Sequence, residues 1–292
     1  MKKILVLGAY GQLGSEVNKL INTNKQYSES ANFIFTDADS LDITNFNALS
    51  GYFKKNNFDY IINCAAYTNV DKAEDDKEKA YLINSTAVKY LSELAKKYSI
   101  HLIHVSTDYV FNGENPLPYK ESDPPTPNSV YGKCKLDGEN EITKLNTGII
   151  IRTSWLYSTF GNNFVKTIIK YAKEKGKLKV VFDQIGTPTY AEDLASAILK
   201  IIFDSIKNKT NFKPGIYNYS NEGVCSWYDF AYEIIKKSNI KCDINAVESK
   251  EFPTRAVRPA NSVLNKEKIK NTFDISIPYW KESLYKMIEE LN

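Results

Sequence analysis

KILVLGAYGQLG, residues 3–14, decides the fold, because it joins an apolar run, three evenly spaced glycines and the start of a helix. The apolar run from Ile4 suits a central strand buried on both faces of a parallel sheet. Gly8, Gly11 and Gly14 let the backbone turn sharply near a diphosphate, and a helix from Gln12 would present free amides to it. The spacing is one residue wider at its first step than the usual dinucleotide pattern. The stretch predicts a dinucleotide site, while an ordinary strand–loop–helix connection stays open as the alternative.

Composition limits the class of protein and of partner. The 292 residues are 42% hydrophobic and 25% charged, which allows one large α/β domain or a domain with a smaller lobe. The net charge of +3 is too small to favour nucleic acid, whose recognition usually needs a clustered basic face. We therefore expect a small anionic ligand and no nucleic-acid partner.

Targeting and cysteine patterns both favour the cytoplasm. Met1-Lys2-Lys3 leads directly into the first strand, so we expect no signal peptide, and no apolar run approaches the ~20 residues that cross a bilayer. The four cysteines show no C-x-x-C pairing, which is typical of reduced thiols rather than of a disulfide frame or a zinc site. We expect a cytoplasmic protein with no membrane segment.

Strands and helices alternate along the first half of the chain. Further strands are predicted at 33–36, 59–63, 101–106 and 148–152, and a short one at 215–220 in the second half of the chain. A long helical segment is predicted at 71–97, with a core stripe of Leu82, Val88, Leu91 and Leu94. Five strand–helix units in order predict an α/β fold with a doubly wound, Rossmann-like parallel sheet. We assign residues 1–153 and about 182–212 to a dinucleotide-binding domain, and about 154–181 and 213–292 to a smaller mixed α/β substrate-binding lobe.

Asp37 ends the second predicted strand, 23 residues beyond Gly14. An acidic residue about 20 residues past the glycines can accept hydrogen bonds from the adenosine ribose. Its charge would repel a ribose 2′-phosphate and so favours NADH, although nearby lysines leave NADPH open. A polar turn without any ligand explains the same residues equally simply.

Tyr131 and Lys135 lie four residues apart on a predicted helix, so both side chains share one face. We expect the Lys135 ammonium to lower the pKa of Tyr131 from its usual value of about 10 toward working pH. Tyr131 could then exchange a proton with the oxygen of a carbonyl that receives a hydride. Thr107, at the end of the strand 101–106, could donate a second hydrogen bond to that oxygen.

The Tyr-x-x-x-Lys spacing also occurs at Tyr171/Lys175 and Tyr232/Lys236, where surface helix pairs are the simpler explanation. Only Tyr131 follows a Ser/Thr-bearing strand end in the half of the chain that carries the glycines. His101 and His104 lie within a predicted buried strand, and we interpret both as core residues with satisfied hydrogen bonds.

Together these motifs resemble the extended short-chain dehydrogenase/reductase family and, within it, the dTDP-4-dehydrorhamnose reductases. The resemblance runs from Met1 to the segment around Trp280 and rests on the order of the motifs. Its motifs are the glycine stretch, 63–74 (NCAAYTNVDKAE), 106–111 (STDYVF), Tyr131-x-x-x-Lys135, 152–155 (RTSW), 161–164 (GNNF) and Arg258-Pro259-x-Asn261-Ser262.

The resemblance implies reduction of the 4-keto group of dTDP-4-dehydro-6-deoxy-L-mannose to dTDP-L-rhamnose, with hydride from NADH or NADPH. It implies catalysis by Thr107, Tyr131 and Lys135, with Tyr131 as the proton donor and Lys135 also in contact with the nicotinamide ribose. The cofactor would contact Gly8, Gly11, Gln12, Leu13, Gly14, Asp37, Asp42, Ile43, Ala65, Ala66 and Tyr67. The nucleotide sugar would contact Thr107, Asp108, Trp155, Asn162, Asn163 and Arg258. Trp155 would cover the sugar, although core packing alone would also explain a tryptophan there.

Two further implications of the resemblance concern assembly. Some relatives form homodimers through carboxylates and magnesium, and Glu16, Glu192 and Glu290 stand at matching positions, where solvated surface is the simpler interpretation. We therefore predict no metal site and leave magnesium and a homodimer as possibilities. Two other functions stay open: a nucleotide-sugar epimerase or dehydratase that retains its cofactor, and a non-catalytic regulatory subunit of methionine adenosyltransferase.

Overall fold

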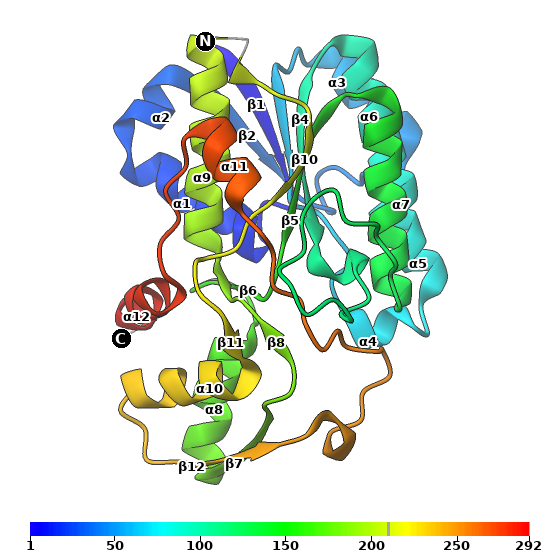
Figure 1. Cartoon of the computed structure of the whole chain (residues 1–292). Helices are drawn as coiled ribbons and strands as arrows, with labels where there is room; N and C mark the ends of the chain where they lie inside the picture. Colours follow the sequence, from blue (N-terminus) through cyan, green and yellow to red (C-terminus); the bar gives the residue numbers. More distant parts are fainter. Residues whose placement is uncertain (209–210, 292) are drawn as a thin grey trace.

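The computed structural model describes residues 1–208 and 211–291, and its centre is a six-stranded parallel sheet in the order β10-β5-β4-β3-β1-β2 (Figure 1). The strands are β1 Lys2–Leu7, β2 Ala31–Thr36, β3 Tyr60–Asn63, β4 His101–Thr107, β5 Gly148–Thr153 and β10 Gly215–Asn218. The order reverses between β1 and β3, as in doubly wound folds. The predicted α/β fold class is therefore confirmed.

Helices cover both faces of this sheet (Figure 1). One face carries α1 Gln12–Thr23, α2 Lys25–Ser30, α9 Ala191–Lys207 and α11 Glu267–Phe273, and the other carries α3 Phe46–Lys55, α6 Ala87–Tyr98 and α7 Val130–Leu145. Alternation within β1 explains the two layers, because Ile4 and Val6 pack into one core while Leu5 and Leu7 pack into the other. All four side chains are fully buried, as the apolar run predicts.

A smaller group of elements lies below the carboxyl edge of the sheet in Figure 1. It contains β6 Leu156–Tyr157, α8 Phe164–Lys175, β7 Lys177–Val181, β8 Ile185–Gly186, β9 Thr189–Tyr190, β11 Cys225–Ser226, α10 Trp227–Lys237 and β12 Asp243–Val247. The helix α12, Trp280–Leu291, packs on α10. These elements share a core of their own, built around residues such as Tyr157, Phe230 and Trp280.

The predicted 71–97 helix is broken into α4 Val70–Ala73, α5 Lys77–Tyr81, a π-helical turn η1 Leu82–Thr86 and α6. Val88, Leu91 and Leu94 are buried as predicted, but Leu82 is 41% exposed. The prediction for Leu82 was wrong because a π-helical turn adds a residue to the turn and so shifts the buried face.

The predicted two-domain division stays a prediction, but two segments of the proposed lobe belong with the central sheet. β10 forms the sheet's outer strand beside β5, and α11 packs on β10. Tyr217 of β10 and Phe273 of α11 enter the core that also contains Ile4 and Val6. The boundary at residue 213 therefore does not follow the packing.

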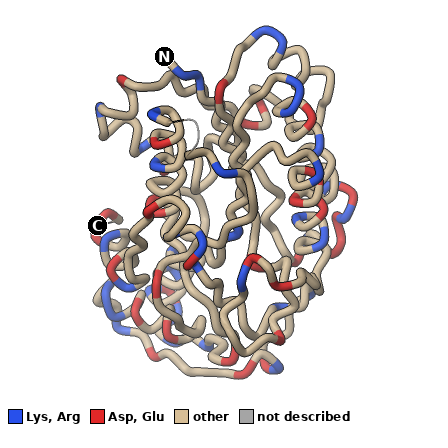
Figure 2. The backbone as a smooth tube through the Cα atoms, turned by 45° about the horizontal axis from the view of Figure 1, so that its top comes forward, with Lys and Arg blue, Asp and Glu red and all other residues tan. Residues whose placement is uncertain are grey.

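Two further whole-chain features bear on the expected partners. Figure 2 shows Lys and Arg interspersed with Asp and Glu along the backbone. Within residues 1–208 and 211–291, no helix combines the length and the apolar character that a membrane crossing requires.

Candidate active site

The glycine stretch forms one wall of a groove at the carboxyl edge of the sheet. Gly8 has φ +73°, and a Cβ placed on it would lie 2.7 Å from the backbone nitrogen of Ala65. Only glycine fits this close approach and this left-handed backbone. The groove is lined by Leu7, Gly8, Gly11, Thr36, Asp37, Ala38, Leu41, Asp42, Ile43, Thr44, Cys64, Ala65, Ala66 and Ile83.

The lining of this groove fits a dinucleotide. The Thr36 hydroxyl is buried there without a hydrogen-bond partner, and Asp37 accepts hydrogen bonds from the backbone amides of Tyr10 and Ala38 at 2.9 and 2.8 Å. Asp42, also predicted to contact the cofactor, accepts a hydrogen bond from the Thr44 amide at 2.9 Å. The carboxylates at the ends of this groove are held in place by local backbone amides.

Three other residues predicted to contact the cofactor, Leu13, Gly14 and Tyr67, make contacts that hold the backbone around the groove in place. Leu13 packs into the core, and a Cβ on Gly14 would lie 2.3 Å from the Gly8 carbonyl oxygen. Tyr67 is fixed by Asn84, whose side chain accepts from the Tyr67 amide and donates to its carbonyl. These contacts set the path of the groove walls.

The end of β4 and the start of α7 bring the predicted catalytic residues together. The Thr107 hydroxyl donates to Asp108 at 3.0 Å and accepts from the Tyr109 amide at 3.2 Å. The ring of Tyr131 packs edge-to-face on Tyr109, with centroids 5.6 Å apart. The Ser129 hydroxyl caps α7 at the Gly132 amide and so fixes the start of the helix that carries Tyr131.

The expected lowering of the Tyr131 pKa by Lys135 was wrong for the ligand-free protein. Burial raises the pKa of Tyr131 far above its usual value, while the neighbouring Thr107 hydroxyl acts in the opposite direction. The amino group of Lys135 donates instead to the Val105 carbonyl at 2.7 Å and lies 3.2 Å from His104 Nε2. The lysine is held on the β4 side of its helix, so its charge does not offset the burial of the phenol.

Burial also shifts the pKa of the groups beside Tyr131. The pKa of Lys135 is lowered to about 8 by burial, and the pKa of Asp108 is raised to about 6 by burial. Low-dielectric surroundings disfavour a charge of either sign. Burial therefore shifts the pKa of each group toward its uncharged form, while neither shift is large enough to remove the charge at pH 7.

Trp155, predicted to cover the sugar, stacks on Trp227 of α10 with ring centroids 3.5 Å apart. Its backbone has φ +48°, a left-handed conformation that is unusual for a large side chain. A Cβ on Gly186 would lie 2.6 Å from the Trp155 ring, so a glycine is required beneath it. Neighbouring side chains thus fix the orientation of this indole.

Asn163 links the smaller group of elements to the glycine loop. Its amide nitrogen donates to Gln12 at 3.0 Å and to the Ser158 carbonyl at 2.7 Å, while its oxygen caps α8 at the Lys166 amide. The adjacent Asn162 is exposed. A predicted cofactor residue and a predicted substrate residue are therefore in direct contact.

Arg258 lies on the loop before α11, with its guanidinium in a pair of polar contacts. It forms an ion pair with Asp71 and donates to the Tyr109 hydroxyl at 2.7 Å. Tyr109 in turn contacts Tyr131, so one ring lies between Arg258 and the tyrosine predicted to be catalytic.

The three glutamates considered for magnesium converge on the Lys19 ammonium. Lys19 bonds Glu192 at 2.6 Å, also bonds Glu290, and lies 3.8 Å from Glu16. Across residues 1–208 and 211–291, no group of three or more His, Cys, Asp or Glu side chains is placed to hold a metal ion. The residues do not fit a magnesium site, because an ammonium already compensates their charge.

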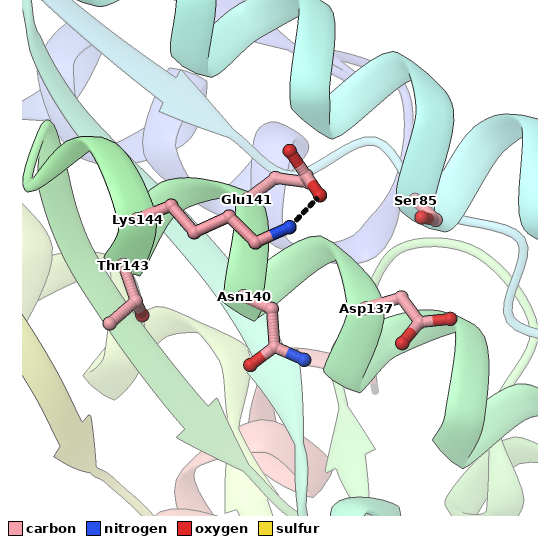
Figure 3. Close-up of a pocket in the computed structure, with 6 residues that line it drawn as sticks. All are labelled: Ser85, Asp137, Asn140, Glu141, Thr143 and Lys144. Atoms are coloured by element: carbon pink, nitrogen blue, oxygen red, sulfur yellow. Dashed lines mark hydrogen bonds and ion pairs between the residues drawn. The ribbon is translucent and has the colours of Figure 1, made fainter.

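A second hollow lies over the solvent face of α7, away from the groove (Figure 3). It is lined by Ser85, Asp137, Asn140, Glu141, Thr143 and Lys144, with Lys144 and Glu141 joined by a 2.7 Å ion pair. None of the predicted site residues lines it, and Lys135 on the same helix is buried on the opposite side.

Residues 1–292 match the family model described as the RmlD substrate binding domain. A dTDP-4-dehydrorhamnose reductase of Aggregatibacter actinomycetemcomitans is 41% identical over 292 residues, covering 97% of each chain. The chain belongs to the dTDP-4-dehydrorhamnose reductase family.

Solved structures of this reductase family share the whole fold. A dTDP-4-dehydrorhamnose reductase from Clostridium acetobutylicum is 42% identical, with a TM-score of 0.91 and 99% of each chain covered. One from Bacillus anthracis, in complex with NADP, is 37% identical, with a TM-score of 0.92 and 99% of this chain and 100% of that chain covered.

Sequence reasoning did not single out several residues that contact the predicted site residues. His104 was interpreted as a core residue, yet its ring contacts Lys135 as well as Asn63. Trp227 and Asp71 contact Trp155 and Arg258 across large sequence separations. A signal for His104 was available, because it precedes Thr107, the threonine predicted to be catalytic, by three residues on the same strand.

Proposed function

We propose that the protein reduces the 4-keto group of dTDP-4-dehydro-6-deoxy-L-mannose to give dTDP-L-rhamnose, using NADH or NADPH. The observation that carries the proposal is the buried set of Thr107, Asp108 and Tyr131 at the carboxyl edge of the sheet, beside the glycine groove. The names of the relatives supply the substrate class.

The cofactor would lie along the groove, with Gly8 and Gly11 at its diphosphate and Asp37 at its adenosine ribose. When bound, its nicotinamide supplies a hydride to the carbonyl carbon. The missing Cβ of Gly8 and the unpartnered Thr36 hydroxyl support this placement.

Tyr131 would donate the proton to the developing alkoxide. Because its pKa is raised by burial, the phenol carries its proton throughout the neutral range and is ready to act as an acid. The Thr107 hydroxyl would stabilise the same oxygen, and its present acceptor, Asp108, holds it in place. Lys135 would contact the nicotinamide ribose, as the resemblance implies.

The nucleotide sugar would lie between the carboxyl edge of the sheet and the smaller group of elements. Trp155 would cover the sugar ring, and its stack on Trp227 supports a fixed hydrophobic wall. Asn162, Asn163 and Arg258 would hold the diphosphate, with Arg258 exchanging its Asp71 partner for phosphate oxygens.

The cellular location and assembly belong to the same proposal. Cys64, Cys134, Cys225 and Cys242 are all free thiols, which supports a reducing compartment such as the cytoplasm. The homodimer implied by the resemblance stays a prediction, and sedimentation velocity over a range of protein concentrations tests it.

The deciding experiment follows NADH or NADPH absorbance with the purified protein and dTDP-4-dehydro-6-deoxy-L-mannose. We expect turnover in wild type, and in Tyr131→Phe a loss of about 10²–10⁴-fold or more, the usual contribution of a general acid, with cofactor affinity nearly unchanged. Tyr232→Phe, in the exposed Tyr-x-x-x-Lys pair on α10, is the matched control and should retain full activity.

Two results would count against the proposal. Tightly bound NAD that survives purification, with no net oxidation of added cofactor, would identify an epimerase or dehydratase instead. A large loss of cofactor binding in Tyr131→Phe would assign that residue a structural role.

A further inference from the structure

His104 lies directly behind the predicted catalytic lysine and connects three elements of the fold. The imidazole is fully buried on β4. Its Nδ1 is 2.9 Å from the side-chain nitrogen of Asn63 on β3, and its Nε2 is 3.2 Å from Lys135 Nζ on α7. The ring therefore bridges the sheet and the catalytic helix.

The proton on the imidazole is located by the partners of Asn63. The side-chain oxygen of Asn63 accepts a hydrogen bond from the Ala65 amide at 3.2 Å. The side-chain nitrogen of Asn63 consequently faces His104, and an amide nitrogen can only donate. His104 Nδ1 must then be the acceptor, which leaves the single proton of a neutral imidazole on Nε2.

The Nε2–H group faces Lys135 Nζ, so the lysine nitrogen must accept a hydrogen bond from it. An ammonium group has three donors and no acceptor, whereas a neutral amine carries a lone pair. The lysine nitrogen also donates to the Val105 carbonyl at 2.7 Å, a bond that an amine and an ammonium make equally well. We propose that His104, oriented by Asn63, is a positioning residue that donates a hydrogen bond to Lys135 and so favours the neutral amine in the ligand-free protein.

The surroundings of both groups support this arrangement. Burial and the nearby lysine hold the pKa of His104 well below its usual value, so the imidazole is neutral. Burial lowers the pKa of Lys135 to about 8, against opposing effects from Cys134, Glu139 and Cys64.

Glu139, the carboxylate among these groups, is already paired with Arg152 at 2.6 Å and fully buried with it. Its charge is therefore largely compensated. A hydrogen bond to the amine should lower the Lys135 pKa by about one further unit.

The inference rests on the proposed function in assigning His104 a role at the same site, but its test needs no turnover. The first measurement is the ¹⁵N spectrum of the imidazoles in wild-type protein. The chain contains two histidines, so a His101→Gln variant assigns the spectrum. We expect an unprotonated Nδ1 and a protonated Nε2 for His104 at pH 9, where Lys135, with a pKa of about 8, is mainly an amine; a proton on Nδ1 at this pH would overturn the proposal.

The second measurement is the titration of Lys135 in protein labelled with ¹³C at lysine Cε, assigned by its absence in Lys135→Met. In His104→Phe we expect the Lys135 midpoint to rise by about one pH unit, because the donor to the amine is lost. The ring of His101 packs on Phe212 at the start of the same strand. The variant His101→Gln should therefore leave the titration midpoint of Lys135 unchanged.

A fall of the midpoint in His104→Phe would mean that the imidazole accepts from an ammonium, and no shift would mean that it has no influence on the lysine. Either result contradicts the proposal. Absence of reductase activity alongside the expected titrations would instead reject the proposed function and leave the His104 assignment intact.

Discussion

At the scale of single residues, burial rather than charge pairing sets the resting state of the site. Tyr131, Lys135 and Asp108 are each shifted toward their uncharged forms. Burial of the charged form is unfavourable for Asp108, whose side chain belongs to a residue that is 2% exposed.

Asp108→Asn should make the protein more stable at pH 8. The folded pKa of Asp108 is raised from 3.8 to about 6, so between these values the folded protein holds a proton that the unfolded chain has lost. Above pH 6 the buried charge costs on the order of 2–3 kcal/mol, and this penalty disappears as the pH falls toward 4. Urea unfolding at pH 8, 6 and 4 measures the difference between variant and wild type.

Asp39→Asn, in an exposed turn, is the control for this prediction and should change the free energy of unfolding by less than about 0.5 kcal/mol at each pH. A variant Asp108→Asn that is less stable than wild type at pH 8 would show that the charge is better compensated than its burial indicates. Lower activity of the same variant would be no surprise, because groups that hold a site in place often cost stability.

At the scale of elements, the close approach of α7 to its neighbours positions Tyr131 and Lys135, the residues proposed to be catalytic. A Cβ on Gly132 would lie 2.2 Å from the Tyr109 carbonyl oxygen, and one on Gly138 would lie 2.3 Å from the Asn84 carbonyl oxygen. Asn84 lies in the π-helical turn η1, whose altered backbone brings its side chain to Tyr67. The irregular turn and the two glycines thus form one packing unit between the groove and the catalytic helix.

Gly138→Ala should therefore destabilise the protein and slow turnover. The added methyl meets backbone, which cannot move aside as a flexible side chain would, and such overpacking costs about 1–3 kcal/mol. Turnover should fall as well, because Tyr131 and Lys135 stand on the helix that must shift. Thermal unfolding and the reductase assay measure the two effects.

Gly51→Ala in α3 is the matched control, because a Cβ there meets nothing within 4 Å. It should stabilise the protein by about 0.5–1 kcal/mol through higher helix propensity. Equal effects of the two substitutions would mean that the close approach of α7 is not required.

At the scale of the whole molecule, the cluster around Lys19 joins elements from distant parts of the chain. Lys19 on α1 bonds Glu192 on α9 and Glu290 on α12, and Lys286 also pairs with Glu192. Glu16 is fully buried and bonded to Ser158, and its pKa is raised mainly by burial. These ion pairs hold α12 against α1 and α9, two helices that cover the central sheet.

Lys19→Met should lower the free energy of unfolding by about 1–3 kcal/mol at pH 7.5, because it leaves half-buried carboxylates without their shared cation. The loss should shrink at pH 5, because burial raises the pKa of Glu16 and protonation of this carboxylate relieves its repulsion with the neighbouring ones. Lys89→Met, which removes an exposed pair with Glu93 at 3.9 Å, is the control and should change stability by less than about 0.5 kcal/mol. If the two variants are equally stable, the cluster contributes nothing to the fold.

Local patterns predicted the fold class and the central strands, because Ile4 to Leu7 and the comparable runs are long, apolar and β-branched. The strand β10 was identified as a strand, but four residues carry no signal for which sheet they join. The division into domains and the assignment of individual contacts to cofactor and sugar stay predictions. Contacts between residues far apart in the chain could not be predicted from local patterns. Examples are the contact of His104 with Lys135 and the ion pair of Asp71 with Arg258, which are 187 residues apart.

The smaller group of elements has a consequence for exchanging substrate preference between relatives. Its core combines residues from 154–190, such as Tyr157 and Val165, with residues from 219–291, such as Phe230 and Trp280, while α9 and β10 return to the central sheet between them. A chimera that replaces one of these segments alone would pair half of one core with half of another. Grafts between members should therefore transfer the parts of both segments that build this core together, while α11, whose Phe273 packs in the core of the central sheet, remains that of the recipient.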